Sequence, residues 1–381
     1  MDVTTTPWAW AGSMADPRAW VLGSDDPAAR WAVLTGVLDR PDDDEDVVAA
    51  RAAMLAHPHT ADLLSRLRPW DAGGTLSGHN HPSFTPNLLH LLADRGLQAG
   101  DDPRVDAALV EMSRHADDAG HLATYAAPRQ GAPPVWGSLL CDSHAIVDVL
   151  LRFGRRPSED PGLAAALRTM ATDLTDTAQG RAWPCIPDPA TGWRGPGRRG
   201  DFCPQVTLEA LRAFSRLPAP DRPSGLLDAA GVALSAWLRR GVEKPYMFGH
   251  GATFKTTKWP VTWYGAHLMV DVLGRWPTLW RGPEANPAHR RALAEVAACL
   301  VAYNTDDAGR VVPRSTFRGF EQHSFGQKAA PSAFATAQLL TVLHRVDDLA
   351  LDAADVDVTT LASSKGGTGV ARPPTRARTA R

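Results

Sequence analysis

Two of the four cysteines of this chain lie near each other in the sequence, with arginines between them. Cys185 comes first, and Cys203 follows in the sequence Asp-Phe-Cys-Pro, where a long apolar helix is expected to begin. Arg198 and Arg199 lie just before it. A cysteine acts as a nucleophile or metal ligand in its thiolate form, and a helix N-terminus or nearby cations lower the pKa of a thiol. The sequence therefore predicts a reactive thiolate at Cys203, with Asp201 as a second catalytic residue.

A third cysteine extends this pattern to a metal site. Cys141 also precedes an apolar segment, well before Cys203 in the chain. If the starts of successive buried helices gather on one side of the fold, Cys141, Cys185 and Cys203 approach one another. Three thiolates and one further ligand suit tetrahedral zinc. The candidates for the further ligand are His144, Asp201 and His267.

Two alternatives to a zinc site stay open, because no close Cys-x-x-Cys spacing is present. The thiols could be free and buried, or two of them could form a disulfide or redox pair. Cys299 lies in an amphipathic segment and is predicted to pack in the core.

Tryptophan and basic side chains are concentrated in the segments that connect the expected helices. With 13 Trp against 4 Tyr, they could line a pocket for an apolar chain, with a cationic edge for a phosphate, carboxylate or diphosphate. Alternatively, the tryptophans fill the interior and the lysines belong to a solvated turn. The predicted substrate-binding residues are Trp183, Trp193, Arg198, Arg199, Lys255, Lys258, Trp259, Trp263 and Tyr264.

Composition restricts the class of protein. The chain has 381 residues, 44% of them hydrophobic, and a formal net charge of -2, which gives no reason to expect a nucleic-acid partner. No apolar run approaches the roughly 18 residues of a membrane span. The first residues lack the basic start and apolar middle of a secretory signal. These observations predict a cytoplasmic protein without a transmembrane segment.

From about residue 70 the sequence repeats a regular helical unit. Each unit contains a nearly all-apolar helix, then an Asp-Pro, Asn-Pro or Pro-Ser start and an amphipathic helix. The apolar helices are expected at 87–95, 143–153, 204–217, 263–276 and 331–346, and the amphipathic ones at 104–115, 163–174, 226–239 and 288–303. A helix that is apolar all round must be buried all round, whereas one polar face allows exposure. The pattern predicts alternating inner and outer helices.

These elements predict an all-α fold, because no segment shows sustained period-2 alternation. Five such units could close into an (α/α) toroid, which we favour, or form an open α-solenoid. Three further helices, at about 27–40, 45–56 and 60–67, predict an N-terminal helical cap, with irregular structure over 1–19. The expected domains are a cap at 1–69, a toroid repeat domain at 70–350 and a disordered basic tail at 351–381.

This pattern resembles the α/α toroid of protein prenyltransferase β subunits and of squalene and hopene cyclases, over about residues 70 to 346. It also resembles uncharacterised bacterial proteins with prenyltransferase-type repeats. Residues 179–183, Gln-Gly-Arg-Ala-Trp, are similar to the Gln-Gly-Trp repeat of the cyclases. The Asp-x-Asp-Asp acid motif of those cyclases is not matched, because Asn304 replaces the first acid.

The prenyltransferase zinc site provides the closer comparison. In that family an Asp-x-Cys at an inner-helix start, a His one repeat later and upstream basic residues bind zinc and diphosphate. Asp201-Phe-Cys203 resembles the first part, and His267 lies about one repeat after Cys203. The resemblance thus implies a zinc site at Cys203, Cys185, Cys141, Asp201 and His267.

Two functions follow as hypotheses. The first is a terpenoid cyclase-like or prenyltransferase-like enzyme, a zinc-thiolate-assisted transferase that binds an apolar, isoprenoid-type substrate. The second is a non-catalytic helical repeat scaffold that binds a partner protein or a lipid.

Overall fold

The computed structural model describes residues 7–73, 78–129, 131–195, 198–240, 249–283 and 285–361. The chain divides into two compact units. Unit 1 contains the described residues of Met1–His57, Trp237–Lys244 and Gly249–Arg381, and unit 2 contains those of Pro58–Ala236 and Pro245–Phe248. The boundaries between the two units differ from the expected domain boundaries at residues 69 and 350, and the expected domains stay a prediction. The expected disorder of the tail is wrong for its first residues, because helix α15 covers Ala350–Ala354, and residues 362–381 lie outside the described residues.

The structure is mainly helical, which confirms the coarser part of the expected fold class. The strands of the described residues are short and form three two-stranded sheets. Two are antiparallel hairpins, β1 (Thr124–Ala126) with β2 (Val135–Gly137) and β3 (Thr175–Thr177) with β4 (Gly180–Ala182). The third pairs β5 (Lys258–Trp259) with β6 (Ser315–Thr316) in parallel.

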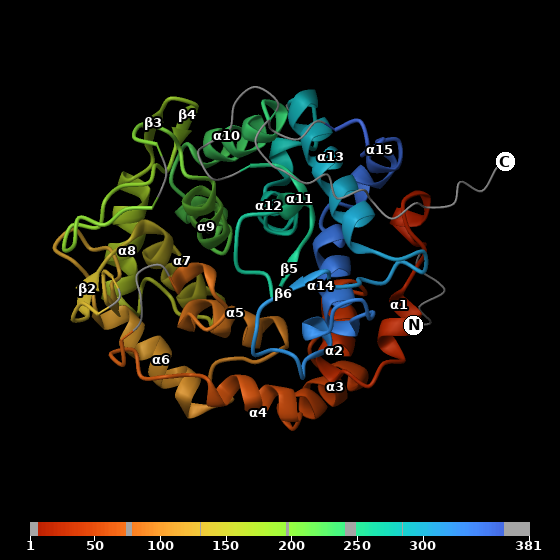
Figure 1. Cartoon of the computed structure of the whole chain (residues 1–381), viewed down its shortest axis with the longest axis horizontal. Coiled ribbons are helices and arrows are strands. Elements are labelled where there is room, and N and C mark those ends of the chain that lie inside the picture. The colour runs from red at the N-terminus through yellow and green to blue at the C-terminus, as the bar shows by residue number, and fades with distance from the viewer. Residues whose placement is uncertain are drawn as a thin grey trace. The chain divides into compact units, whose positions relative to one another are not determined.

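Unit 2 shows the predicted alternation of buried and half-exposed helices. The buried helix α7 packs against α5 on one side and α9 on the other, while α6 and α8 pack behind it, as Figure 1 shows. All but a few side chains of α7 are buried, whereas α6 buries only Val105, Ala108, Leu109 and Met112. The helices are α4 (Pro58–Ser65), α5 (Thr85–Asp94), α6 (Pro103–Arg114), α7 (Leu140–Arg152), α8 (Pro161–Thr172), α9 (Pro204–Phe214) and α10 (Leu226–Leu238).

Aspartate-proline pairs begin the half-exposed helices as the sequence indicates. The Asp102 side chain accepts a hydrogen bond from the backbone N–H of Arg104, and Asp160 accepts one from Leu163. Proline occupies the first helical position in both, where its missing N–H costs nothing. The two hairpins then connect each of these helices to the next buried one. Helix α7 begins shortly after β2, whereas a longer loop connects β4 to the start of α9.

Unit 1 brings the N-terminal and C-terminal helices together. Helix α2 packs against α3 and α14, and α12 packs against α13. Asp26 and Asp44 cap α2 and α3, and the side chain of each accepts hydrogen bonds from two backbone N–H groups. The helices are α1 (Arg18–Leu22), α2 (Pro27–Gly36), α3 (Glu45–Leu55), α11 (Ala252–Lys255), α12 (Ala266–Leu273), α13 (Pro287–Asn304), α14 (Ala333–His344) and α15 (Ala350–Ala354).

The expectation of irregular structure over 1–19 is wrong for part of that segment. A 3-10 turn, η2, covers Ala9–Gly12, and α1 begins at Arg18. Trp10 is fully buried, and its indole N–H donates to Asp347 Oδ1 at 2.8 Å. This contact with a residue far along the chain orders the turn, and no local pattern reveals it.

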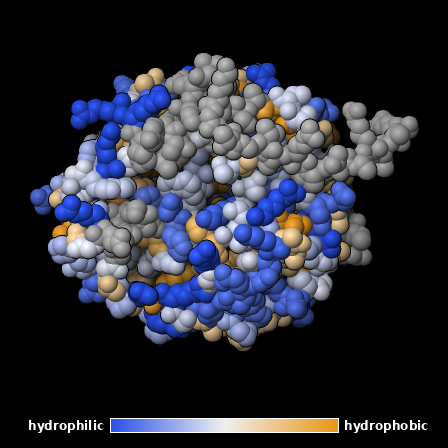
Figure 2. All heavy atoms as spheres, in the orientation of Figure 1, coloured by the Kyte–Doolittle hydropathy of each residue, from blue (hydrophilic) through white to orange (hydrophobic). Residues whose placement is uncertain are grey.

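Hydrophilic side chains cover most of the described surface on the face that Figure 2 shows. The exposed large hydrophobic residues are Trp20, Val48, Ile186, Leu227 and Leu351. They come from separate elements, and single exposed residues of this kind are common on protein surfaces. Within the described ranges, no helix has the length and apolar character that a membrane span requires.

Candidate functional site

Three possible metal ligands converge in unit 2. The ligand atoms of His79, Cys141 and Asp142 all lie within 4.8 Å of one another. His79 Nδ1 lies 3.3 Å from Asp142 Oδ1, and the Cys141 thiol donates to the same oxygen at 3.8 Å. The His79 and Asp142 side chains are only 10% and 3% exposed. This group, called the His79 cluster below, could hold a metal ion.

Two buried helices position the His79 cluster. Helix α7 begins at Leu140, which places Cys141 and Asp142 in its first turn, where the helix dipole favours negative charge. His79 belongs to the short 3-10 turn η3 (Gly78–Asn80). Asn87, near the start of α5, donates from its amide to the His79 backbone oxygen at 2.6 Å. The starts of two adjacent helices therefore fix both halves of the cluster.

Hydrogen bonds around the cluster orient its carboxylate. Thr124 Oγ1, in strand β1, donates to Asp142 Oδ2 at 3.2 Å. Asp188, which is 1% exposed, accepts the backbone N–H of Ser138 at 2.7 Å and that of Thr191 at 2.8 Å. These contacts attach the connecting loop after β4 to the residues just before α7. Partners of this kind hold the ligands of a metal site in their binding geometry.

Burial and neighbouring charges shift the pKa values of His79 and Cys141 in opposite directions. Burial raises the pKa of the Cys141 thiol to about 12. Burial by itself would lower the pKa of His79, but Cys141 and Asp142 outweigh it and raise that pKa to about 12. The thiol therefore stays protonated unless a stronger cation than imidazolium enters. A divalent metal has that effect, since metal binding to cysteine releases the thiol proton.

The structure also brings Cys185 and Cys203 together in unit 2. An antiparallel bridge joins Pro184 to Phe202, and the Cys203 N–H donates to the Trp183 oxygen at 2.7 Å. The two thiols are hydrogen-bonded to each other, and Cys203 also interacts electrostatically with Cys141. The predicted proximity of these thiols is thus present in the described residues.

The prediction of a reactive thiolate at Cys203 is wrong, because the pKa of this thiol is raised and not lowered. Cys203 is the N-cap of α9 and Pro204 is the first helical residue, as predicted. Its thiol is 6% exposed, and the hydrogen bond with Cys185 together with burial raises its pKa well above the ordinary value. Arg198 and Arg199 are exposed and do not overcome this. The effect of tertiary burial exceeds that of the helix N-terminus.

The other residues predicted around Cys203 have different environments. Asp201 accepts a hydrogen bond from the Gln179 amide at 2.9 Å, and its ligand atoms are not part of the His79 cluster. Trp183 is fully buried, and its indole N–H donates to the Met170 oxygen at 2.8 Å. Trp193 packs against Ala126 and Leu139, the small apolar group that also contacts Cys141. Trp183 therefore contributes to the core, and Trp193 lies near the cluster.

A scan against protein-family models finds no match, and a search of curated protein sequences finds no significant one. The site is therefore interpreted from its own chemistry. One nitrogen, one sulfur and one carboxylate oxygen form a donor set that suits zinc, with three protein ligands and a fourth position for substrate or water.

Sequence reasoning missed two of the three residues in this set. Asp142 directly follows Cys141, so its proximity was available from the sequence. His79 lies much earlier in the chain, in a short turn without a pattern of its own. Of the predicted ligands, only Cys141 belongs to the His79 cluster, while Cys203 interacts with Cys141 and with Cys185.

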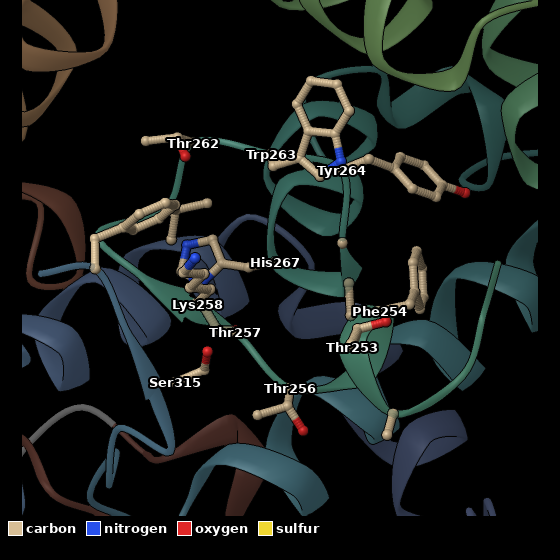
Figure 3. A pocket seen from close by; sticks show the side chains of 15 residues that line it. Thr253, Phe254, Thr256, Thr257, Lys258, Thr262, Trp263, Tyr264, His267 and Ser315 are labelled. Carbon is tan, nitrogen blue, oxygen red and sulfur yellow. The ribbon is translucent and has the colours of Figure 1, made fainter. Parts of the chain in front are cut away.

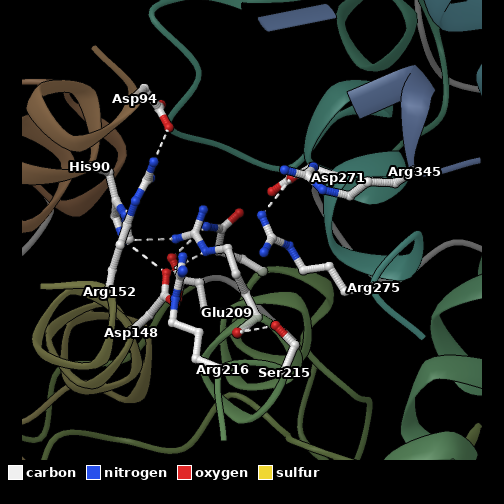
Figure 4. Close-up of polar contacts among 12 residues, drawn as sticks. His90, Asp94, Asp148, Arg152, Glu209, Ser215, Arg216, Asp271, Arg275 and Arg345 are labelled. Carbon is white, nitrogen blue, oxygen red and sulfur yellow. Dashed lines mark hydrogen bonds and ion pairs between the residues drawn. The ribbon is translucent and has the colours of Figure 1, made fainter. Parts of the chain in front are cut away.

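A second buried carboxylate in unit 2 belongs to Asp148, and arginines compensate its negative charge. Asp148 of α7 is completely buried and pairs with Arg212 Nε at 2.6 Å, with Arg216, and with His90 Nε2 at 2.9 Å. Figure 4 shows His90, Asp148, Arg152 and Arg216 meeting between their helices. The guanidinium groups hold the pKa of Asp148 well below its usual range against the effect of burial. This Asp148 network joins α5, α7 and α9.

Unit 1 contains a cavity of about 320 Å³. Three predicted substrate-binding residues, Lys258, Trp263 and Tyr264, line it, and so does His267, as Figure 3 shows. Trp259 is not among the lining residues, and its ring packs edge-on against that of His267 with the ring centroids 5.4 Å apart. Lys255 is 3% exposed, and its ammonium donates to the Leu361 oxygen at 3.3 Å.

Proposed function

We propose that this chain is a zinc-dependent transferase that acts on an apolar, isoprenoid-type substrate and folds as a closed (α/α) toroid. The convergence of His79, Cys141 and Asp142 carries the proposal, because a thiol, an imidazole and a carboxylate whose ligand atoms lie within 4.8 Å of one another form a donor set that suits zinc. The alternation of buried and half-exposed helices supports the toroid. The substrate class is the part of the proposal that depends on the resemblance to prenyltransferases.

Each side chain of the cluster has a role in this reaction. Cys141, His79 and Asp142 provide sulfur, nitrogen and oxygen ligands, and Thr124 orients the carboxylate. Zinc, when bound, would stabilise a thiolate at neutral pH and neutralise developing negative charge. Asp142 is buried and His79 and Cys141 are half-buried, and the exchange of a proton for a metal ion at Cys141 would change the charge of the site.

The transfer step exchanges one bond for another. The acceptor thiol releases its proton to solvent, its sulfur forms a bond to C1 of the prenyl chain, and the C1–O bond breaks to release diphosphate. No oxidant or reductant is required. If His79, Cys141 and Asp142 held a zinc ion, its charge would favour the thiolate form of the acceptor.

The test measures thioether formation from geranyl diphosphate and N-acetylcysteine by mass spectrometry. Zinc-loaded wild-type protein is expected to form the product, and chelation or Cys141→Ala is expected to abolish it. Cys299→Ala is the matched control, because Cys299 is buried in α13. A zinc-loaded wild-type protein that releases no diphosphate and forms no thioether would reject the transferase.

One observation favours a second function, a non-catalytic scaffold that binds a partner protein or a lipid. Burial raises the pKa of Cys141, and the contact with Cys185 together with burial raises that of Cys203. Without a metal, both thiols would be inert packing groups. A protein that binds no zinc in either the presence or the absence of added metal would support this function instead.

A further inference from the structure

The cavity of unit 1 is formed by consecutive segments of the chain and one strand from further along. Helix α11, the start of β5, the loop that follows and the first turn of α12 provide most of the wall. Ser315 and Phe317, at strand β6, close it through the parallel pairing of β5 with β6. A volume of about 320 Å³ lies at the lower end of the range for small-molecule sites.

Aromatic rings form a preorganised apolar wall in this cavity. The Tyr264 ring lies 5.2 Å from that of Phe254. The Tyr264 hydroxyl is hydrogen-bonded to His250 Nε2 at 2.8 Å, and burial lowers the pKa of His250 to about 3. A neutral His250 therefore fixes the tyrosine by a hydrogen bond without introducing charge. Trp263 adds a further ring, and Figure 3 shows Trp263 and Tyr264 towards one end of the cavity.

The polar part of the lining has one sign of charge. Among the 15 described residues that line the cavity there is one lysine, one histidine and no aspartate or glutamate. The Lys258 ammonium lies 3.7 Å from the centre of the Phe317 ring, and this contact holds it at the cavity. Hydroxyl groups of Thr256, Thr262 and Ser315 lie on the same lining.

Helix α12 adds to the positive potential on this side. Its N-cap, Gly265, has no side chain to accept the first N–H groups, and Gly265, Ala266 and His267 all line the cavity. The positive end of the helix dipole therefore lies at the cavity together with Lys258. Positive charge and an aromatic wall match a ligand with an anionic head and an apolar body.

We propose that this cavity binds a small apolar monocarboxylate, such as an aryl- or alkyl-substituted carboxylic acid. The head group follows from charge: one lysine and one helix N-terminus match a single negative charge, whereas a diphosphate requires several arginines, lysines or a metal ion. The apolar body is inferred from the aromatic rings in the lining, which belong to Phe254, Trp263, Tyr264 and Phe317. The site is complete within unit 1, so the inference does not depend on the proposed zinc chemistry.

The test uses isothermal titration calorimetry with three probes that share one body: 3-phenylpropanoate, 3-phenylpropanamide and 3-phenylpropyl phosphate. The carboxylate is expected to bind the wild-type protein about tenfold more tightly than the neutral amide, which corresponds to one charged hydrogen bond. Chelator-treated protein is expected to give the same affinities. That result would separate this inference from the metal-dependent proposal.

Substitutions of cavity-lining residues test where the charged head and the apolar body of the ligand bind. Lys258→Met is expected to weaken carboxylate binding about tenfold and to leave amide binding unchanged. Lys258→Arg, which retains the charge, is expected to preserve carboxylate binding. Lys328→Met is the control, because it removes an exposed positive charge that does not line the cavity. Val261→Phe, which fills the cavity from its wall, is expected to abolish binding of both probes.

Several results would overturn the inference. Equal affinities for carboxylate and amide, or equal effects of Lys258→Met and Lys328→Met, would remove the role of the charge. Tighter binding of the phosphate than of the carboxylate would reject the monocarboxylate. No binding of any probe by a wild-type protein with normal circular dichroism would reject the site itself.

Discussion

Two buried aspartates of the same helix, Asp142 and Asp148, have opposite kinds of partner. Asp148 contacts two arginines and a histidine in the network that links α5, α7 and α9. Asp142, at the start of the helix, contacts His79, Cys141 and Thr124. In the part of the chain that the structure describes, no lysine or arginine pairs with Asp142.

This difference separates a structural charge network from a candidate metal centre. Arginine cannot give up its proton at accessible pH, so Asp148 has a permanent counter-charge and needs nothing else. Imidazole and thiol both exchange protons for a metal ion. The Asp148 network is therefore complete within the protein, whereas the proposed role of the His79 cluster is to bind a divalent cation that would replace its protons.

The largest expected effect concerns the two aspartates themselves. Asp148→Asn leaves the buried charges of Arg212 and Arg216 uncompensated and is expected to lower the free energy of unfolding by about 3–5 kcal/mol. Asp142→Asn in metal-free protein is expected to cost about 1 kcal/mol, because His79 can become neutral. Urea denaturation of both variants measures this. Equal losses for the two substitutions would contradict the comparison.

Zinc is expected to stabilise the protein through the His79 cluster and not through the Asp148 network. At a free zinc concentration about 100-fold above the dissociation constant, the wild-type protein is expected to gain about 2.7 kcal/mol of stability. Asp142→Asn should largely lose this gain, while Asp148→Asn should retain it. Thermal unfolding with and without zinc provides the measurement, and an equal gain in both variants would place the metal elsewhere.

His90 gives the Asp148 network a pH dependence. Burial, followed by the charge of Arg212, lowers the pKa of His90 to about 4. Between its ordinary pKa and this lowered value, the unfolded chain binds a proton that the folded protein does not. Stability should therefore fall as the pH falls through this window, by about 1.4 kcal/mol per pH unit for this group. His90→Gln should reduce the slope, and His57→Gln, outside the network, should not.

The smallest expected effect is on thiol reactivity. Cys185 is half-buried, whereas Cys203 and Cys299 are buried, and burial raises the pKa of the Cys299 thiol to about 11. In native protein at mildly alkaline pH, iodoacetamide should therefore label Cys185 before Cys203 and Cys299. Peptide mass spectrometry over time gives the order, and zinc should slow the labelling of Cys141. Cys203 reacting first would restore the activated thiolate that its position at α9 predicted.

The sequence allowed much of the fold to be predicted because helix starts are local. Asp26, Asp44, Asp102, Asp160 and Asn286 all cap the helices expected behind them. The buried helices are recognisable because their apolar residues cover every face. The repeat spacing predicted Cys141 and Cys203 at the starts of buried helices; Cys141 lies in the first turn of α7, and Cys203 is the N-cap of α9.

The properties that could not be predicted depend on contacts between distant segments. The pKa of Cys203 depends on burial and on Cys185, which a bridge between Pro184 and Phe202 brings near. His79 reaches Asp142 through a turn that Asn87 holds. Neither contact follows a periodic pattern, so spacing alone directed the expected metal site towards Cys203 and His267.

The most direct test of the central claim is the zinc content of protein purified without added metal, measured by inductively coupled plasma mass spectrometry. A site with three protein ligands predicts about one zinc per chain in the wild-type protein and in Cys299→Ala. Cys141→Ala and His79→Ala should lose most of that metal. Less than about 0.2 zinc per chain in the wild-type protein, unchanged by Cys141→Ala, would contradict the metal centre.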